Sequence, residues 1–107
     1  MGLFIANAFS LNMVTAPAVV KVSEVDIETV KDFLKNGYTS AVGHQSTADY
    51  IKVVTGIDVV ANRISISLKP GDMLIVLQLL GRLPEGSVLS QDDLAKVPCK
   101  WYMVEVV

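Results

Sequence analysis

The chain is 107 residues long, a length typical of one domain with one modest hydrophobic core. Hydrophobic residues make up 51% of it, and this excess fits either a tightly packed core or a surface buried between subunits. Nine basic and eleven acidic residues give a formal net charge of −2, which argues against binding of long nucleic acids, since such proteins need a basic face.

The cysteine content and the N-terminal residues predict the cellular setting. Cys99 is the single cysteine, so no disulfide can form within the chain, and we expect a buried structural thiol in a reducing compartment. Residues 1–6 are apolar without a positively charged start, and no apolar run approaches the roughly 20 residues of a membrane span. The sequence therefore predicts a soluble cytoplasmic protein with no membrane partner.

The first half of the chain is predicted to alternate strands with helices. Short apolar runs predict strands over residues 3–8, 18–22 and 38–42. Two capping boxes, each a serine followed three residues later by aspartate, predict helices capped by Ser23 and by Ser46. These helices are expected to end at Gly37 and Gly56, because glycine accepts the left-handed conformation that stops a helix.

The second half of the chain is predicted to supply the rest of the sheet. Alternating apolar and polar residues over 64–68 predict a strand with one wet face, and the apolar run over 73–80 predicts a central strand. Gln78 is the polar exception in that run, and it must be hydrogen-bonded if it is buried. A third capping box, at Ser90, predicts a short helix that ends before Pro98, and residues 101–107 predict a last strand. We therefore expect one α/β domain over residues 1–107, with a mixed β-sheet flanked by helices.

His44, the only histidine, lies where the second predicted helix begins. A helix N-terminus presents unpaired N–H groups and a partial positive charge, which suit a phosphate. Histidine titrates near neutral pH and can act there as an acid or a base. A lone histidine is also often a plain surface or core residue, so the neighbouring polar residues must decide between the two interpretations.

Three polar clusters follow the ends of predicted strands, where sites on α/β folds usually lie. They comprise Asn7, Ser10 and Asn12; His44, Ser46 and Thr47; and Gln78, Arg82 and Glu85. An arginine can clamp phosphate and a carboxylate can orient a histidine, so Arg82, Glu85 and His44 would make a phosphodiester-cleaving set. The alternative to this catalytic set is that Arg82 and Glu85 form a solvated ion pair on a loop. Arg63 is either a second contact for an anion or an ordinary charge at a strand edge.

No spacing in the sequence resembles a metal site, so any phosphate chemistry is expected to need neither a metal nor another cofactor. RNA makes this feasible because its 2′-hydroxyl is a built-in nucleophile. Such an enzyme needs in-line geometry, charge stabilisation and an acid for the leaving 5′-oxygen.

Four short segments, in this order along the chain, resemble the viral ring nucleases: residues 7–13, 43–47, 62–63 and 82–86. These small proteins of archaeal viruses, phages and mobile elements act as type III anti-CRISPR proteins. The resemblance spans residues 3 to about 90. It implies a homodimer that binds cyclic tetra-adenylate across its two-fold axis and cleaves it, in the cytoplasm of the host cell, to linear oligoadenylates with 2′,3′-cyclic phosphate ends.

The resemblance also implies roles for single residues. His44 would protonate the leaving 5′-oxygen, Arg82 would contact phosphate and Glu85 would support the histidine. Ligand-binding positions would be Asn7, Ser10, Asn12, Ser46, Arg63 and Gln78. For Ser46, Arg63 and Gln78 a purely structural role stays an equal alternative.

Two other functions fit the sequence. One is a non-catalytic dimer that sequesters a cyclic nucleotide or blocks a host protein. The other is a small DNA-binding regulator, which the acidic balance disfavours.

Overall fold

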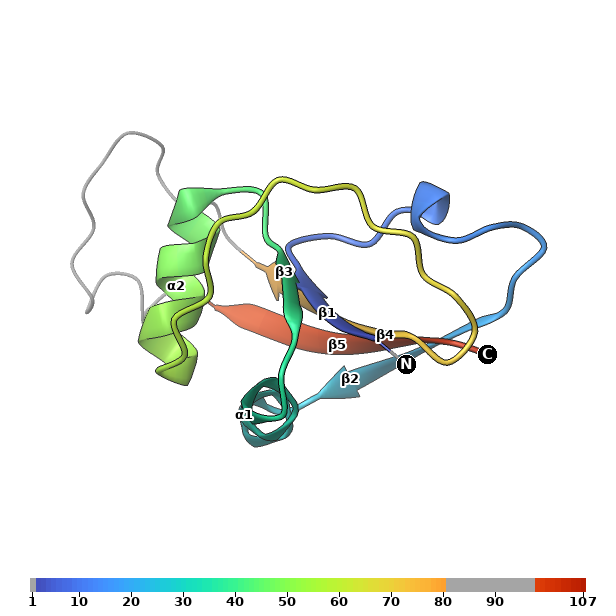
Figure 1. The fold of residues 1–107 in the computed structure, drawn as a ribbon. Helices are drawn as coiled ribbons and strands as arrows, with labels where there is room; N and C mark the ends of the chain where they lie inside the picture. The colour runs from blue at the N-terminus through green and yellow to red at the C-terminus, as the bar shows by residue number, and fades with distance from the viewer. Residues whose placement is uncertain (1, 81–97) are drawn as a thin grey trace.

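One mixed sheet of five strands organises residues 2–80 and 98–107, the part of the chain that this computed structural model describes (Figure 1). The strands lie in the order β2-β5-β4-β1-β3, and they are β1 (Leu3–Ala6), β2 (Val20–Val25), β3 (Thr39–Ala41), β4 (Met73–Leu79) and β5 (Cys99–Val106). β1 pairs in parallel with both β3 and β4, whereas β5 pairs antiparallel with β4 and β2. The predicted α/β class and mixed sheet are confirmed.

The helices α1 (Ile27–Lys35) and α2 (Gln45–Thr55) pack on the same face of this sheet. Alternate apolar residues of the central strands, Ile75 and Leu77 on β4 with Trp101 on β5, form the floor of the core there. The helices cover that floor with Val30, Leu34, Ala48, Tyr50 and Ile51. The two described helices that flank the predicted sheet thus share one face, and the helix predicted after Ser90 lies outside the described residues.

The opposite face of the sheet is covered only in part, and by irregular chain. The turn η1 (Leu11–Met13) and the 57–72 segment cross it, and Ile66 and Leu68 of that segment pack with Leu74 and Val104 in a second core cluster (Figure 1). On the β2 side of this face Val22 stays 57% exposed. The second face is thus closed over β1 and β4 and open toward β2.

Residues 64–68 do not form the strand that their alternation predicted. Leu68 makes a single bridge to Val14, and the neighbouring residues join no ladder. Ile66 and Leu68 are nevertheless buried and the residues between and beside them are exposed. The alternation of apolar and polar residues therefore reflects which side chains are buried against the sheet. A chain segment can bury alternate side chains in this way without forming the hydrogen bonds of a strand.

Both predicted helix starts are wrong by a few residues. β2 continues through Ser23, which pairs with Met103 of β5, and Asp26 caps α1 by accepting a hydrogen bond from the backbone N–H of Thr29 at 2.8 Å. In α2 the capping position belongs to His44 rather than Ser46. The predicted stops are confirmed, since Gly37 and Gly56 both have positive φ.

β4 lies between β5 and β1, as its apolar run predicted, and Leu74, Ile75 and Leu77 are fully buried. Gln78, however, is exposed rather than buried, because β4 emerges from the core near its end. Among the described residues no helix has the length and apolar character needed to cross a membrane.

Replacement of Ile75 by alanine is expected to lower the free energy of unfolding by about 2–5 kcal/mol, because it leaves a cavity in the fully buried centre of β4. Urea denaturation measures the change. Val60→Ala is the control, since Val60 is 63% exposed and its loss should cost less than about 0.5 kcal/mol. Equal effects of the two substitutions would contradict the assignment of the core.

Asp72 links the N-terminus to the turn before β4. Its two carboxylate oxygens accept hydrogen bonds from the backbone N–H groups of Lys69 and Gly2, each at 2.8 Å, and these bonds lower the pKa of the carboxyl below its ordinary value of 3.8. A lowered pKa in the folded state stabilises the fold above the pKa of the unfolded chain. That stability is lost as the pH falls through the folded-state pKa.

Asp72→Asn removes this titration and one of the two acceptors. We expect the variant to be less stable than the wild type near neutral pH, and the difference to shrink as the pH falls from about 5 to about 2. Urea denaturation across this pH range measures it. A stability difference that does not change with pH would contradict the role of the ionised carboxylate.

Candidate functional site

The ends of three parallel strands bring the predicted polar residues to one edge of the sheet. β1, β3 and β4 run in the same direction, so their carboxyl ends meet at this edge. Asn7 follows β1, His44 follows β3 by way of Gly43, and Gln78 lies near the end of β4. Ala6, the last residue of β1, pairs with both Ala41 of β3 and Val76 of β4, which fixes the relative heights of the three ends.

His44 is the N-cap residue of α2. Its backbone is extended, with φ −130° and ψ 134°, and its carbonyl accepts the hydrogen bond from the N–H of Ala48 at 3.1 Å. Its imidazole makes no capping bond to the helix and is exposed. The first N–H groups of a helix have no partner within it, so the ring stands beside free backbone donors and the positive end of the helix dipole.

Gly43, the residue before His44, is held from both sides. The backbone N–H of Gly43 donates to Oδ1 of Asn7 at 3.2 Å, and the Gly43 carbonyl accepts from Nε of Arg63 at 3.1 Å. Asn7 and Arg63 were predicted as ligand contacts, and here they form a clamp on Gly43. The guanidinium uses one donor for this bond, and its fork carries four more N–H groups.

Asn62 fastens the segment that supplies Arg63, a role that the sequence did not reveal. Its backbone N–H donates to the carbonyl of Val42 at 2.7 Å and its side-chain amide donates to the carbonyl of Ser40 at 2.8 Å. The hydroxyl of Ser40 in turn donates to the carbonyl of Val60 at 2.6 Å. These bonds attach residues 60–62 to the open edge of β3, so they determine where Arg63 lies.

Ser10 and Asn12 lie apart from this clamp. The hydroxyl of Ser10 donates to the side-chain oxygen of Asn12 at the start of η1, and both residues are exposed. Figure 1 shows η1 well away from α2, so within one chain these two residues do not join His44. Ser46 is exposed in the first turn of α2, next to the helix mouth. The first predicted cluster is therefore split, with Asn7 alone at the site.

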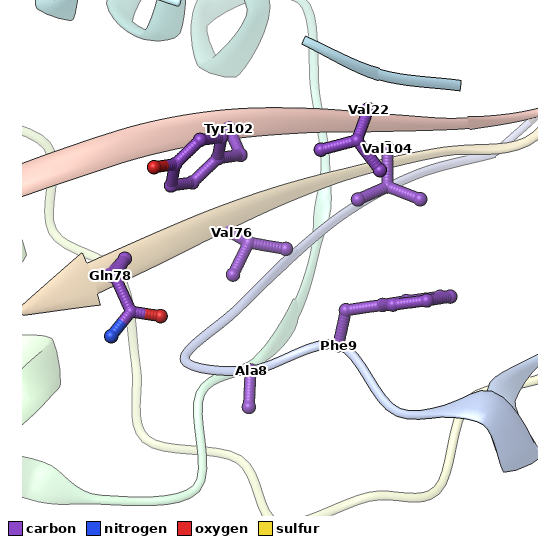
Figure 2. A pocket seen from close by; sticks show the side chains of 7 residues that line it. All are labelled: Ala8, Phe9, Val22, Val76, Gln78, Tyr102 and Val104. Carbon is purple, nitrogen blue, oxygen red and sulfur yellow. The ribbon is translucent and has the colours of Figure 1, made fainter. Parts of the chain in front are cut away.

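Gln78 lines a hollow on the open face of the sheet. The hollow has a volume of about 280 Å³, and Figure 2 shows the seven residues that line it: Ala8, Phe9, Val22, Val76, Gln78, Tyr102 and Val104. The amide of Gln78 donates one long hydrogen bond, from Nε2 to the carbonyl of Leu79 at 3.3 Å. Ala8 and Phe9 follow Asn7 directly, so the hollow and the Gly43 clamp share one loop.

Arg82 and Glu85 lie outside the described residues, so their predicted contacts with phosphate and with His44 stay predictions. Across residues 2–80 and 98–107, no three histidine, cysteine or acidic side chains come together as metal ligands. Cys99 is half-buried beside Tyr50 rather than fully buried. Burial is the main cause that raises the pKa of Tyr50, and a hydrogen bond with Cys99 raises it further. Tyr50 belongs to α2, and the pair lies in the core between this helix and the sheet, on the face opposite the hollow.

The arrangement contains the kinds of group that anion binding and proton donation require. Free helix N–H groups attract phosphate, an imidazole at the same place can act as general acid, and the adjacent hollow offers apolar surface with one amide. The described residues thus place an exposed imidazole, the first N–H groups of a helix and an apolar hollow at the ends of neighbouring strands.

Comparison with known proteins places this fold among proteins from viruses and bacteria. Residues 3–101 match the sequence model of the STIV B116-like family. Uncharacterized protein 26 of Sulfolobus islandicus filamentous virus is 34% identical, over 92% of this chain and 91% of its own length, and YddF of Bacillus subtilis is 32% identical, over 86% and 88%. The structure resembles that of B116 of Sulfolobus turreted icosahedral virus, with a TM-score of 0.84 and 26% identity over 98% of this chain and 99% of B116.

Replacement of Asn7 by alanine removes the acceptor of the Gly43 N–H. We expect the exchange of that amide hydrogen to become about two- to tenfold faster, which corresponds to the net contribution of one hydrogen bond. Amide exchange followed by NMR measures the rate. Asn12→Ala is the matched control, because Asn12 bonds to Ser10 instead, and it should leave Gly43 unchanged.

Proposed function

We propose that this chain, which belongs to the STIV B116-like family, is a metal-independent ring nuclease that opens cyclic tetra-adenylate. This second messenger is made by type III CRISPR complexes, and its removal in the host cytoplasm would counteract that immunity. The proposal extends the resemblance of residues 7–13, 43–47, 62–63 and 82–86 to the viral ring nucleases.

The observation that carries the proposal is the placement of His44. The only imidazole of the chain is exposed at the mouth of α2, makes no capping bond, and follows Gly43, which Asn7 and Arg63 hold. A structural N-cap would use serine, threonine, aspartate or asparagine, whose oxygen bonds to the helix N–H groups. Histidine at this position leaves those groups free for an anionic ligand.

The reaction uses the ligand's own nucleophile. A ribose 2′-hydroxyl attacks the adjacent phosphorus, its proton passes to solvent, and the bond from phosphorus to the 5′-oxygen breaks. His44, in its protonated form, gives a proton to that leaving oxygen and is then reprotonated by solvent. The product ends carry a 2′,3′-cyclic phosphate and a free 5′-hydroxyl.

The remaining residues stabilise charge and orientation in this proposal. The helix N–H groups and Arg82 compensate the negative charge that builds on the phosphate, and Glu85 orients the imidazole. Asn7 and Arg63 act on His44 through Gly43, so they are positioning residues. Ser10, Asn12 and Ser46 then bind the ligand as the resemblance implies.

A two-fold dimer completes the site in the same proposal. A ring of four identical nucleotides is compatible with a two-fold axis, and two copies of the chain supply two histidines and duplicate each arginine. This duplication concentrates positive charge despite the net charge of −2 on each chain. It also provides a route by which Ser10 and Asn12 of one copy reach the ligand held at the other copy's helix mouth.

His44→Ala is expected to slow the cleavage of radiolabelled cyclic tetra-adenylate by about 10²–10⁴-fold, the usual contribution of a general acid, while binding persists. Product separation after single-turnover incubation measures the rate, and addition of EDTA should change nothing. Lys52→Ala, on the last turn of α2, is the control and should cleave normally.

Three results would contradict the proposal. Full cleavage by the His44→Ala protein would exclude His44 as the acid, and loss of cleavage with EDTA would exclude a metal-independent reaction. Tight binding of the ring with no product from the wild type would instead support a non-catalytic sequestering module.

A further inference from the structure

A cavity on the helix side of the sheet lies where β2 ends and α1 begins, and we call it the notch. It has a volume of about 510 Å³, and its walls come from the end of β2, the start of α1, the start of β5 and, on α2, Tyr50 and Val54. These two residues follow His44 by six and ten positions, so they lie roughly 9–15 Å along the helix axis from it. The notch is therefore separate from the helix mouth.

The hydrogen bonds of β5 show which way each of its residues faces. The carbonyl of Pro98 accepts from the N–H of Leu80, on the β4 side, at 2.9 Å, and the N–H of Val107 donates to the carbonyl of Val19, on the β2 side, also at 2.9 Å. Successive residues of a strand direct their backbone groups to opposite sides. Odd-numbered residues of β5 therefore face β2, and Cys99 is one of them.

β2 stops before it reaches Cys99. The ladder between β2 and β5 ends at the pair of Val25 and Trp101, and Ile27, which register would place opposite Cys99, is already the first residue of α1. The N–H and carbonyl of Cys99 thus point past the end of β2 toward the notch, without a ladder partner in the part of the chain that the structure describes. One extended residue placed there can pair with both groups, as when a strand adds to a sheet edge.

The helix side of the notch determines which side chain that residue carries. Residues directly opposite each other in a sheet share one face, and Cys99 packs toward the helix-side core, so the added side chain lies against Val54 and Trp101. The hydroxyl of Tyr50 is already hydrogen-bonded with Cys99, so this wall offers apolar surface. An aliphatic side chain fits it.

The rim of the notch carries an excess of negative charge. Glu24 and Asp26 contribute two carboxylates, whereas Lys100 contributes one ammonium group. Hydrogen bonds from the hydroxyl and the N–H of Thr29 lower the pKa of Asp26, so its carboxylate is ionised at neutral pH. Neither carboxylate forms an ion pair with another described residue. The rim therefore favours a basic ligand and repels an acidic one.

We propose that the notch binds a basic, extended peptide segment of a partner protein. One residue of the segment pairs with the backbone of Cys99 and places an aliphatic side chain beneath α2, while flanking basic side chains meet Glu24 and Asp26. A volume of about 510 Å³ lies within the roughly 300–1,000 Å³ of ligand pockets and accommodates that residue with parts of its neighbours. This interaction surface depends on none of the chemistry proposed for His44.

Two residue types that occur once in the chain, the cysteine Cys99 and the tryptophan Trp101, both line the notch and report its occupancy. The probe is the acetylated and amidated pentapeptide serine-lysine-leucine-lysine-serine, titrated into the full chain up to millimolar concentration. We expect the peptide to change the emission of Trp101 and to slow the reaction of Cys99 with a thiol reagent, both in proportion to the bound fraction.

Altered peptides and one pair of variants separate the contributions to binding. Glutamate in place of both lysines should weaken binding at least about fivefold, and N-methylation of the leucine about two- to tenfold, the loss of one hydrogen bond. Glu24→Gln should weaken binding of the lysine peptide about 1.5- to fivefold, whereas Glu105→Gln, near the other end of β5, is the matched control and should change nothing. Unfolding midpoints identify any variant that fails to fold.

The outcomes keep this inference apart from the proposed function. Binding of the lysine peptide that persists in His44→Ala would support a separate site, whether or not the ring is cleaved. No response of Trp101 and Cys99 at millimolar peptide, or equal binding of the lysine and glutamate peptides, would overturn the inference. A thiol that reacts only when the protein unfolds, with or without peptide, would also overturn it, because the protein's own chain would then fill the notch.

Discussion

The parallel pairing of β1 with both β3 and β4 is the constraint on which the candidate site depends. β1 is first in the chain but lies inside the sheet, so its end brings Asn7 between the end of β3 and the end of β4. From there Asn7 reaches Gly43 on one side, and the following residues Ala8 and Phe9 reach the open sheet face on the other. One strand end therefore connects His44 at the helix mouth with the apolar hollow.

The sequence predicts best the strands whose apolar runs are buried between neighbouring strands of the sheet. The run over 73–80 became the central β4, and residues 101–107 became most of β5. The capping boxes predicted the wrong helix starts because a serine followed by an acidic residue is only a local pattern. Pairing of a residue with a neighbouring strand can outweigh its preference for the capping position. Ser23 bonds into the ladder with β5, and Asp26, which the pattern used as the distal partner, is itself the cap.

The sequence predicted several of the residues that lie at the candidate site, but it did not predict the hydrogen bonds between them. His44, Asn7, Arg63 and Gln78 all lie at the predicted edge, because strand ends and polar residues are visible in sequence. The clamp on Gly43 was not visible, since the side chains of Asn7 and Arg63 bond there to main-chain groups that every residue carries. Phe9 and Tyr102 were also missed, because an aromatic residue in a strand or loop reads as core until the sheet register shows which face it occupies.

The segment between α2 and β4 makes the two edges of the sheet differ in how far their backbone groups are already hydrogen-bonded. Asn62 occupies the carbonyls of Ser40 and Val42, so the outer margin of β3 is already engaged by the protein's own irregular segment. β2, at the other margin, pairs with β5 on one side within the described residues and carries Lys21 and Glu24 on its exposed length. Charged side chains are a common protection of such margins against unwanted strand addition. A further strand, from another copy or from a peptide, would therefore meet an occupied margin at β3 and a charged margin at β2, and β2 is the margin farther from His44.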